Sequence, residues 1–199
     1  MNGNKLMESL KNVRWDVADK TYGNNHSTLI GLLVEWWISL SPGTNRVLEG
    51  GPTNGYKKRG HCDALLCEYD TPQGVLEVEG TYYKKTVQKI GTFFSAKREE
   101  FRSLSFGIVL FYSYSLEGRG DNKRFIGPIV PKEEIKKITK KHPEKLIIAI
   151  TISKKFNKQH SGVRSWNNYY QGELDKIESY LFSKGKEIKC TLLYQHKSS

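Results

Sequence analysis

The segment HCDALLCEYDTPQGVLEVEG, residues 61–80, decides how the rest of the chain is interpreted. Two apolar runs, residues 61–69 and 74–79, flank the turn-forming residues 70–73. Such runs, separated by a turn of this composition, are typical of a β-hairpin. We therefore expect a hairpin here, with Gly80 ending its second strand.

Three carboxylates lie on this hairpin: Asp63 in the first strand and Glu77 and Glu79 in the second. Side chains alternate between the two faces of a strand, so both glutamates should point to one face. If the turn centres near Pro72, odd-numbered residues pair with odd-numbered ones. Asp63 is then expected on the same face as Glu77 and Glu79.

A cluster of carboxylates on a buried strand repels itself unless a cation lies among them. Hard divalent cations, above all Mg²⁺, bind carboxylate oxygens in this way, with Mn²⁺ as the usual substitute in experiments. Beside a phosphodiester, such an ion polarises the phosphoryl group, activates a water molecule and stabilises the leaving oxygen. The alternative is a chance pattern, with Glu77 and Glu79 on the wet face of a half-exposed sheet.

The net charge favours a polyanionic partner. The chain has 32 Lys and Arg residues against 21 Asp and Glu, a formal net charge of +11. An excess of this size attracts polyanions, and DNA and RNA are the commonest ones in a cell. A generically basic protein, or one that faces anionic lipid, remains the alternative.

Two loops have the composition of a nucleic-acid contact, in which cations reach phosphates, Asn and Arg read base edges, and aromatic rings stack on bases. The first places Tyr56 beside three cations, and the second, residues 154–170, combines cations and amides with Trp166. A solvated surface is the alternative for both loops. The candidate contacts are Lys57, Lys58, Arg59, Lys154, Lys155, Arg164, Asn167 and Asn168.

The remaining chain alternates between helical and strand patterns. Apolar spacing predicts helices over residues 5–19, 28–40, 81–104, 131–141 and 166–183, and strands over 105–114, 145–153 and 188–194. Helices that separate apolar strands imply an α/β protein with a mixed sheet covered on both faces. We expect a single domain over residues 1–199, with residues 1–25 as a helical extension and a core of about 28–195.

On these residues the chain resembles the PD-(D/E)XK nuclease superfamily, which has the restriction-endonuclease-like fold. The matching residues are Cys62-Asp63 and Glu77-Val78-Glu79, followed by a helix and a strand in the order of the family core. The resemblance implies that Asp63 and Glu77 bind the metal. It also implies that Glu79 holds the position that is usually lysine, where a minority of members carry a second glutamate assigned to the attacking water.

Three further residues enter through the resemblance. Glu35 lies on the preceding helix, where members of the family often place an acidic residue near the metal. A buried ion pair or a snorkelling side chain would also explain this glutamate. Lys84 and Lys85, at the start of the following helix, can supply the cation that the motif position lacks.

These observations predict a Mg²⁺-dependent endodeoxyribonuclease of the restriction type, acting on DNA as a homodimer. A structure-specific repair or junction nuclease of the same fold is the second hypothesis. The third is a nucleic-acid-binding protein that has kept the fold and lost the chemistry.

Cysteine content and hydropathy indicate where the protein works. The three cysteines cannot all pair with one another, and the N-terminus lacks a signal-peptide pattern. The longest apolar run, residues 29–40, is too short for a membrane span of roughly 20 residues. We expect a cytoplasmic protein without membrane contact.

Cys62 and Cys67 should face opposite sides of their strand, which argues against a zinc site and for buried free thiols.

Overall fold

The sheet is the frame of the molecule. In the computed structural model, the described residues are 2–20, 25–49, 61–80, 83–112, 115–117, 124–126, 128–155 and 173–195. Their seven-stranded sheet has the order β1-β2-β3-β4-β7-β8-β9, and β5 and β6 form a separate pair. The strands are β1 (Asn45–Glu49), β2 (Ala64–Glu68), β3 (Thr71–Glu79), β4 (Phe106–Phe111), β5 (Ser115–Glu117), β6 (Arg124–Ile126), β7 (Leu146–Lys155), β8 (Glu173–Ser183) and β9 (Lys186–Gln195).

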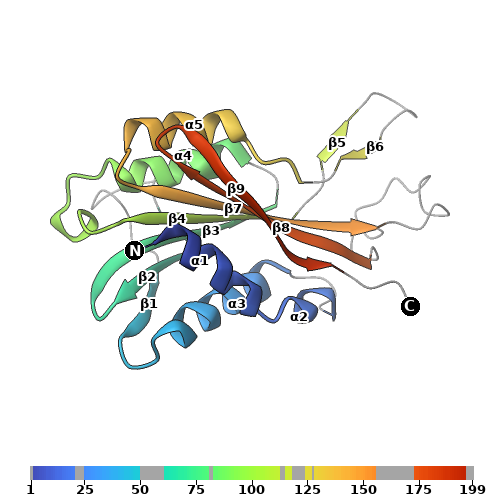
Figure 1. The fold of residues 1–199 in the computed structure, drawn as a ribbon, viewed down its shortest axis with the longest axis horizontal. Helices are drawn as coiled ribbons and strands as arrows, with labels where there is room; N and C mark the ends of the chain where they lie inside the picture. The colour runs from blue at the N-terminus through green and yellow to red at the C-terminus, as the bar shows by residue number, and fades with distance from the viewer. Residues whose placement is uncertain are drawn as a thin grey trace.

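Helices cover both faces of this sheet, as Figure 1 shows. One face, here called the α3 face, is covered by the helices from the start of the chain, and the opposite one, the α4 face, by α4 and α5. The helices are α1 (Gly3–Ser9), the 3₁₀ turn η1 (Leu10–Asn12), α2 (Trp15–Lys20), α3 (Asn25–Leu40), α4 (Tyr83–Phe94), the 3₁₀ turn η2 (Glu99–Phe101) and α5 (Lys132–Lys141). The predicted α/β class, a mixed sheet between two helical layers, is confirmed.

The predicted hairpin is present, but its turn is Tyr69-Asp70 and not residues 70–73, because β3 already begins at Thr71. A β-bulge between Leu66 and Cys67 then brings odd-numbered residues opposite odd-numbered ones, as in the pair Leu65 and Val75. β2 pairs antiparallel with β3, with Ala64 opposite Leu76. β3 then pairs parallel with β4, and β4 with β7. Each of these parallel pairs is connected through a helix, α4 or α5, because a parallel crossover needs a connection of that length. The carboxyl ends of β3, β4 and β7 therefore lie at one edge of the sheet.

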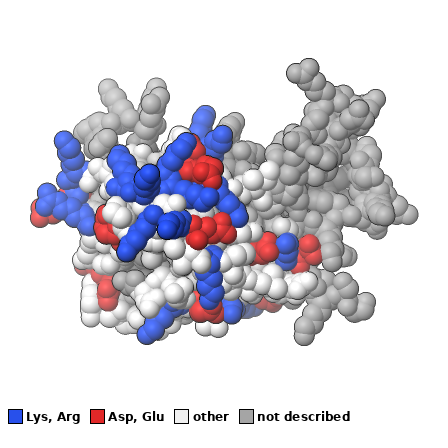
Figure 2. Space-filling model, turned by 45° about the horizontal axis from the view of Figure 1, so that its top comes forward, with Lys and Arg blue, Asp and Glu red and all other residues white. Residues whose placement is uncertain are grey.

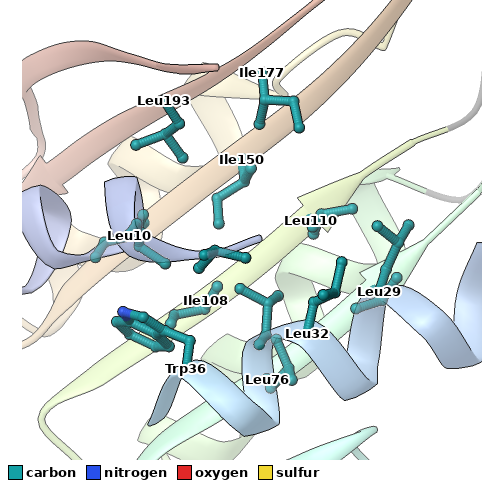
Figure 3. Packing of buried hydrophobic residues seen from close by; sticks show 14 of the residues in the cluster. Leu10, Leu29, Leu32, Trp36, Leu76, Ile108, Leu110, Ile150, Ile177 and Leu193 are labelled. Carbon is teal, nitrogen blue, oxygen red and sulfur yellow. The ribbon is translucent and has the colours of Figure 1, made fainter. Parts of the chain in front are cut away.

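Each face of the sheet has its own apolar cluster. On the α3 face, Leu76 and Ile108 pack against α3 residues such as Leu32 and Trp36, as Figure 3 shows. Leu10 and Trp15, from the N-terminal helices, are buried in the same cluster. Residues 3–20 therefore contribute to the main core. The cluster on the α4 face joins Val75, Val109 and Phe182 to the buried sides of α4 and α5.

Several predicted boundaries differ from the observed ones. The helix expected over 5–19 is divided by η1 into α1 and α2. The helix expected over 81–104 ends at Phe94, because the chain turns back and packs the ring of Phe101 edge-on against Phe93, 5.3 Å between centroids. A continuous helix would carry Phe101 about 12 Å further along the axis, away from this contact. Strand β1 was not predicted.

The helix predicted over 166–183 is wrong for its described part, which is strand β8. Leu174, Ile177 and Leu181 have helix-like spacing. In the strand, Ile177, Ser179 and Leu181 alternate into the α3 side of the sheet, and the buried serine hides the period of two. Pairing with β7 and β9 satisfies the backbone of β8, and this long-range effect overrides the local pattern.

Candidate active site

Glu77 is the centre of the candidate site. It lies in β3 between two other strands, on the α4 face, and only 1% of its surface is exposed. Its Oε1 atom is buried and has no hydrogen-bond partner. An unsatisfied carboxylate oxygen inside a protein is costly, so a position of this kind calls for a ligand or a functional reason.

Lys89 of α4 supplies the cation beside Glu77. Its Nζ atom donates a hydrogen bond to Oε2 of Glu77 at 2.9 Å. Burial acts to lower the pKa of Lys89, but the bond to Glu77 and the charges of Glu77, Asp63 and Glu79 outweigh it and raise the pKa. The ammonium group therefore bonds Glu77 and is near enough to Asp63 and Glu79 for their charges to act on it.

Both the protonated and the ionised form of Glu77 are accessible near neutral pH. Burial raises the pKa of its carboxyl from 4.5 to about 7, although the bond to Lys89 opposes this change. The charges of Asp63 and Glu79 raise the pKa further. A neighbouring cation would favour the ionised form, so the site is ready to lose a proton when positive charge enters it.

Asp63 lies at the edge of the same site. Asp63 immediately precedes β2, and its backbone N–H donates to the carbonyl oxygen of Leu76 at 3.1 Å. Its Oδ2 atom accepts a hydrogen bond from the backbone N–H of Val78 at 2.6 Å. The carboxylate thus replaces a backbone carbonyl at the end of the ladder, and this bond fixes its position against β3.

His26, at the start of α3, contacts this end of the hairpin from the other side. Its Nε2 atom is 3.0 Å from the carbonyl oxygen of Val78 and 3.6 Å from Oδ2 of Asp63. A carbonyl can only accept, so Nε2 must carry the proton. The edge of the His26 ring contacts Tyr112, which follows β4.

Glu79 is held from α4 as well. The hydroxyl of Thr86 donates to its Oε2 atom at 3.2 Å. Thr86 and Lys89 are one helical turn apart and therefore share a face of α4. Two residues on one helix face thus hold the two glutamates on one strand face.

Sequence reasoning found the three carboxylates but missed Lys89, Thr86 and His26. A signal for the first two was present: Val87 and Ile90 are buried against the sheet, so the neighbouring positions Thr86 and Lys89 must border it. Lys84 and Lys85, the cations expected to serve the site, are exposed in the first turn of α4. The cation bonded to Glu77 lies one turn further along.

The structure does not bring Glu35 to the carboxylates. It is exposed on α3, the helix that covers the opposite face of the sheet. From His26, which reaches the site, Glu35 is about 14 Å further along the helix and half a turn around it. The side chain therefore points away from Asp63, and an exposed position also removes the need for a buried partner.

Most of the predicted nucleic-acid contacts lie outside the described residues: Lys57, Lys58, Arg59, Arg164, Asn167 and Asn168. Lys154 and Lys155 are the last two residues of β7. They therefore lie beyond the carboxyl end of the parallel strands, at the same edge of the sheet as Glu79.

The donor set fits a magnesium ion in one respect. Among the described residues, no three His, Cys, Asp or Glu side chains form a group that could hold a metal ion. Mg²⁺ usually takes only one or two carboxylates and completes its shell with water and substrate phosphates. Asp63 and Glu77, which are near enough for the charge of Asp63 to raise the pKa of Glu77, provide such a pair, and Oε1 of Glu77 is unpartnered.

The cysteines give no second site. Cys62 and Cys67 are buried and free, as predicted. Burial, followed by the charge of Glu77, raises the pKa of the Cys62 thiol to about 12, which leaves it unreactive near neutral pH. The prediction that they face opposite sides is wrong: the chain bends at Asp63, and both thiols lie in the α4-face cluster.

Comparison with known proteins finds no match: no family model, curated protein or solved structure is similar to the chain. Within the described ranges, no helix has both the length and the apolar character needed to cross a bilayer. The site must therefore be interpreted from its own geometry, namely a buried, incompletely bonded glutamate held beside an aspartate and a lysine.

Proposed function

We propose that this protein is a Mg²⁺-dependent DNA endonuclease of the PD-(D/E)XK type, with Asp63, Glu77, Glu79 and Lys89 as its active-site residues. The observation that carries the proposal is the buried Oε1 atom of Glu77, which lacks a partner although Lys89 holds the other oxygen of the same carboxylate. A restriction-type homodimer acting in the cytoplasm remains the expected form of the enzyme.

Asp63 and Glu77 would hold the metal ion. When bound, the ion would polarise the scissile phosphate and lower the pKa of a bound water. Asp63 is suited to this role because the N–H of Val78 fixes its carboxylate at the end of the ladder. Glu77 must give up its proton to bind a cation, and its raised pKa, about 7, makes both charge states accessible near neutral pH.

We assign to Lys89 the role of the motif lysine, because the motif position itself carries Glu79. Its ammonium group lies 2.9 Å from Glu77 and is within the electrostatic reach of Asp63 and Glu79. Negative charge develops on the phosphate as water attacks, and a cation fixed in advance stabilises that charge. Glu79, held by Thr86, is left to orient the attacking water.

The arrangement of elements supports the same proposal. Helix α3, the β2–β3 hairpin, α4 and β4 follow one another in the order that the resemblance implies. The carboxylates lie at the hairpin positions of the motif, and Lys154 and Lys155 lie at the same edge of the sheet. A polyanion bound across this edge would meet both the acidic site and part of the positive charge.

The test is cleavage of supercoiled plasmid DNA in Mg²⁺, in Mn²⁺ and in EDTA. We expect cutting that EDTA abolishes, and a loss of at least about a hundredfold in Asp63→Asn, Glu77→Gln and Lys89→Met. Glu68→Gln is the matched control, because this exposed carboxylate belongs to the same hairpin and faces solvent. Discrete fragments would identify restriction, whereas cutting limited to branched or nicked DNA would identify a repair nuclease.

The second candidate function is a nucleic-acid-binding protein without catalysis. The ion pair between Lys89 and Glu77 favours it, because this lysine neutralises the carboxylate without any metal. Full DNA affinity with no cleavage in either metal would establish this function and reject the nuclease. Cleavage by Glu77→Gln at the wild-type rate would reject the assignment of the site.

A further inference from the structure

A ridge of lysines covers the outer side of α5 and the turn between β8 and β9. Figure 2 shows blue side chains gathered on this side of the molecule, with red ones among them. Helix α5 contributes four of the lysines and the turn two. The ridge consists of Lys136, Lys137, Lys140, Lys141, Lys184 and Lys186.

The turn is fixed against the helix. The backbone N–H of Gly185 donates to the hydroxyl of Thr139 at 3.2 Å. A Cβ atom on Gly185 would lie 3.0 Å from the Cβ of Lys140, so a larger residue would crowd the helix at this close approach. The contact holds Lys184 and Lys186, the neighbours of Gly185, beside Lys140.

The turn also places a lysine where the backbone does not favour one. Lys184 and Gly185 both have positive φ angles, 51° and 75°. Two-residue hairpin turns of this kind prefer Asn or Asp at the first position, because other side chains are sterically disfavoured at a positive φ angle. Lys184 therefore adds a positive charge to the ridge although its positive φ angle disfavours a lysine.

Carboxylates neutralise only part of the ridge. Glu133 pairs with Lys136 at 2.8 Å, and Glu134 approaches Lys137 at 3.7 Å. Within the described part of the chain, no ion pair involves Lys140, Lys141, Lys184 or Lys186. The dipole of α5 favours cations in its last turn, but this effect does not extend to the lysines of the turn.

The ridge lies one helix away from the candidate active site, because Lys140 and the β8–β9 turn are on the side of α5 that faces away from α4. Helices α4 and α5 run side by side, with Gly91 against Ile138 and the hydroxyl of Ser95 3.1 Å from Nε2 of His142. This register places Lys89 at the level of Lys136. Packed helices are about 8–10 Å apart, and Lys140 is about 6 Å further along the axis. Both distances are short beside one turn of duplex DNA, about 34 Å.

We infer that the lysine ridge binds the phosphate backbone of duplex DNA within about one helical turn of the cleavage site. This inference rests on DNA as the proposed substrate, but it concerns binding and not catalysis. Clustered ammonium groups without carboxylate partners repel one another, and a row of phosphates relieves that repulsion while releasing counterions. Contacts of this type carry no base information and should be independent of sequence.

The experiment measures binding of a 20-base-pair duplex by fluorescence anisotropy, without metal, over a range of salt concentrations. All proteins carry Glu77→Gln, so that cleavage cannot interfere. We expect Lys140→Ala/Lys184→Ala to weaken binding roughly tenfold and to reduce the slope of log affinity against log salt by about 2. The control, Lys5→Ala/Arg14→Ala, removes two exposed cations on the α3 face.

The outcomes separate this inference from the proposed function. Unchanged affinity and slope in the ridge variant would overturn the inference, whether or not the wild-type protein cuts DNA. Reduced affinity in a protein that never cuts would support the ridge and reject the nuclease. Equal losses in the ridge variant and the control would show a general charge effect and overturn the inference. So would binding to vesicles of anionic lipid but not to the duplex.

Discussion

The two faces of strand β3 are both buried, yet they differ completely in chemistry. On the α3 face, Leu76 lies among apolar side chains (Figure 3), and Val78 is buried in the same apolar cluster. On the α4 face, the next residue, Glu77, is equally buried but carries a carboxylate. The same backbone therefore supports an ordinary core on one side and an ionisable site on the other.

The difference shows which face stabilises the fold and which one reduces its stability. An apolar side chain at position 77 would avoid the cost of the unpartnered Oε1 atom and would pack against Val75 and Val109, which share its face. The carboxylate therefore reduces the stability of the fold, so its presence must be explained by function and not by stability. A site that needs a buried negative charge next to a lysine provides such an explanation.

The largest effect on stability is expected on the α3 face. Leu76→Ala removes a side chain with no exposed surface from the centre of the sheet, so we expect a loss of about 3 kcal/mol in the free energy of unfolding. Urea denaturation followed by circular dichroism measures it. Leu48→Ala, at an exposed leucine of β1, is the control and should cost under about 1 kcal/mol. Equal losses in the two variants would contradict the assignment of the core.

The second effect is a pH dependence that arises from the α4 face. The pKa of Glu77 is 4.5 when unperturbed and about 7 in the folded protein, so the folded state binds more protons between these values. Stability should therefore fall as pH rises through this window, by up to about 3 kcal/mol, and stay low above pH 7.

The difference between wild-type protein and Glu77→Gln isolates this effect, because the contributions of all other groups cancel. Urea unfolding of both proteins from pH 4.5 to 8 should show the variant gaining stability relative to wild type as pH rises. A difference that stays constant over this range would mean that Glu77 titrates as an ordinary glutamate.

A third effect comes from the lysine that partly compensates Glu77. Lys89→Met leaves the buried carboxylate without its cation, and we expect a loss of about 1–2 kcal/mol at pH 8. The side chain of Lys89 is 42% exposed, so solvent screening reduces the effect below that of a fully buried pair. In the Glu77→Gln background the loss should disappear, which a double-mutant cycle would show. Lys84→Met, at an exposed position of the same helix, serves as the control.

The sequence was sufficient to predict that Glu77 and Glu79 share a face, because alternation along a strand determines it. The register of the hairpin was predicted from a turn near Pro72, but the turn is Tyr69-Asp70, and a β-bulge between Leu66 and Cys67 sets the register. The apolar helix over 28–40 was equally clear, since one side of α3 is buried against the sheet. Local patterns are reliable where periodicity and burial agree.

The rest depends on packing between distant segments. Lys89 reaches Glu77 only because α4 crosses β3 at a particular angle and height, which no spacing within the helix specifies. Strand β8 was mistaken for a helix because its pairing with β7 outweighs the local pattern of Leu174, Ile177 and Leu181. Partners of a buried charge and strands with polar interior positions both require the tertiary structure.

The smallest effect tests whether the α4 face is built for function. Thr86→Val removes the hydroxyl that holds Glu79 but keeps the shape of the side chain, so we expect a loss of about 1 kcal/mol. Thr139→Val is the matched control: Thr139 is a buried threonine of α5 whose hydroxyl bonds Ile135 and Gly185. Both variants should lose similar stability, but only Thr86→Val should also slow DNA cleavage, by roughly tenfold, because Glu79 is no longer oriented. If both variants cut DNA at the wild-type rate, Thr86 is merely part of the core, and Glu79 needs no fixed orientation for catalysis.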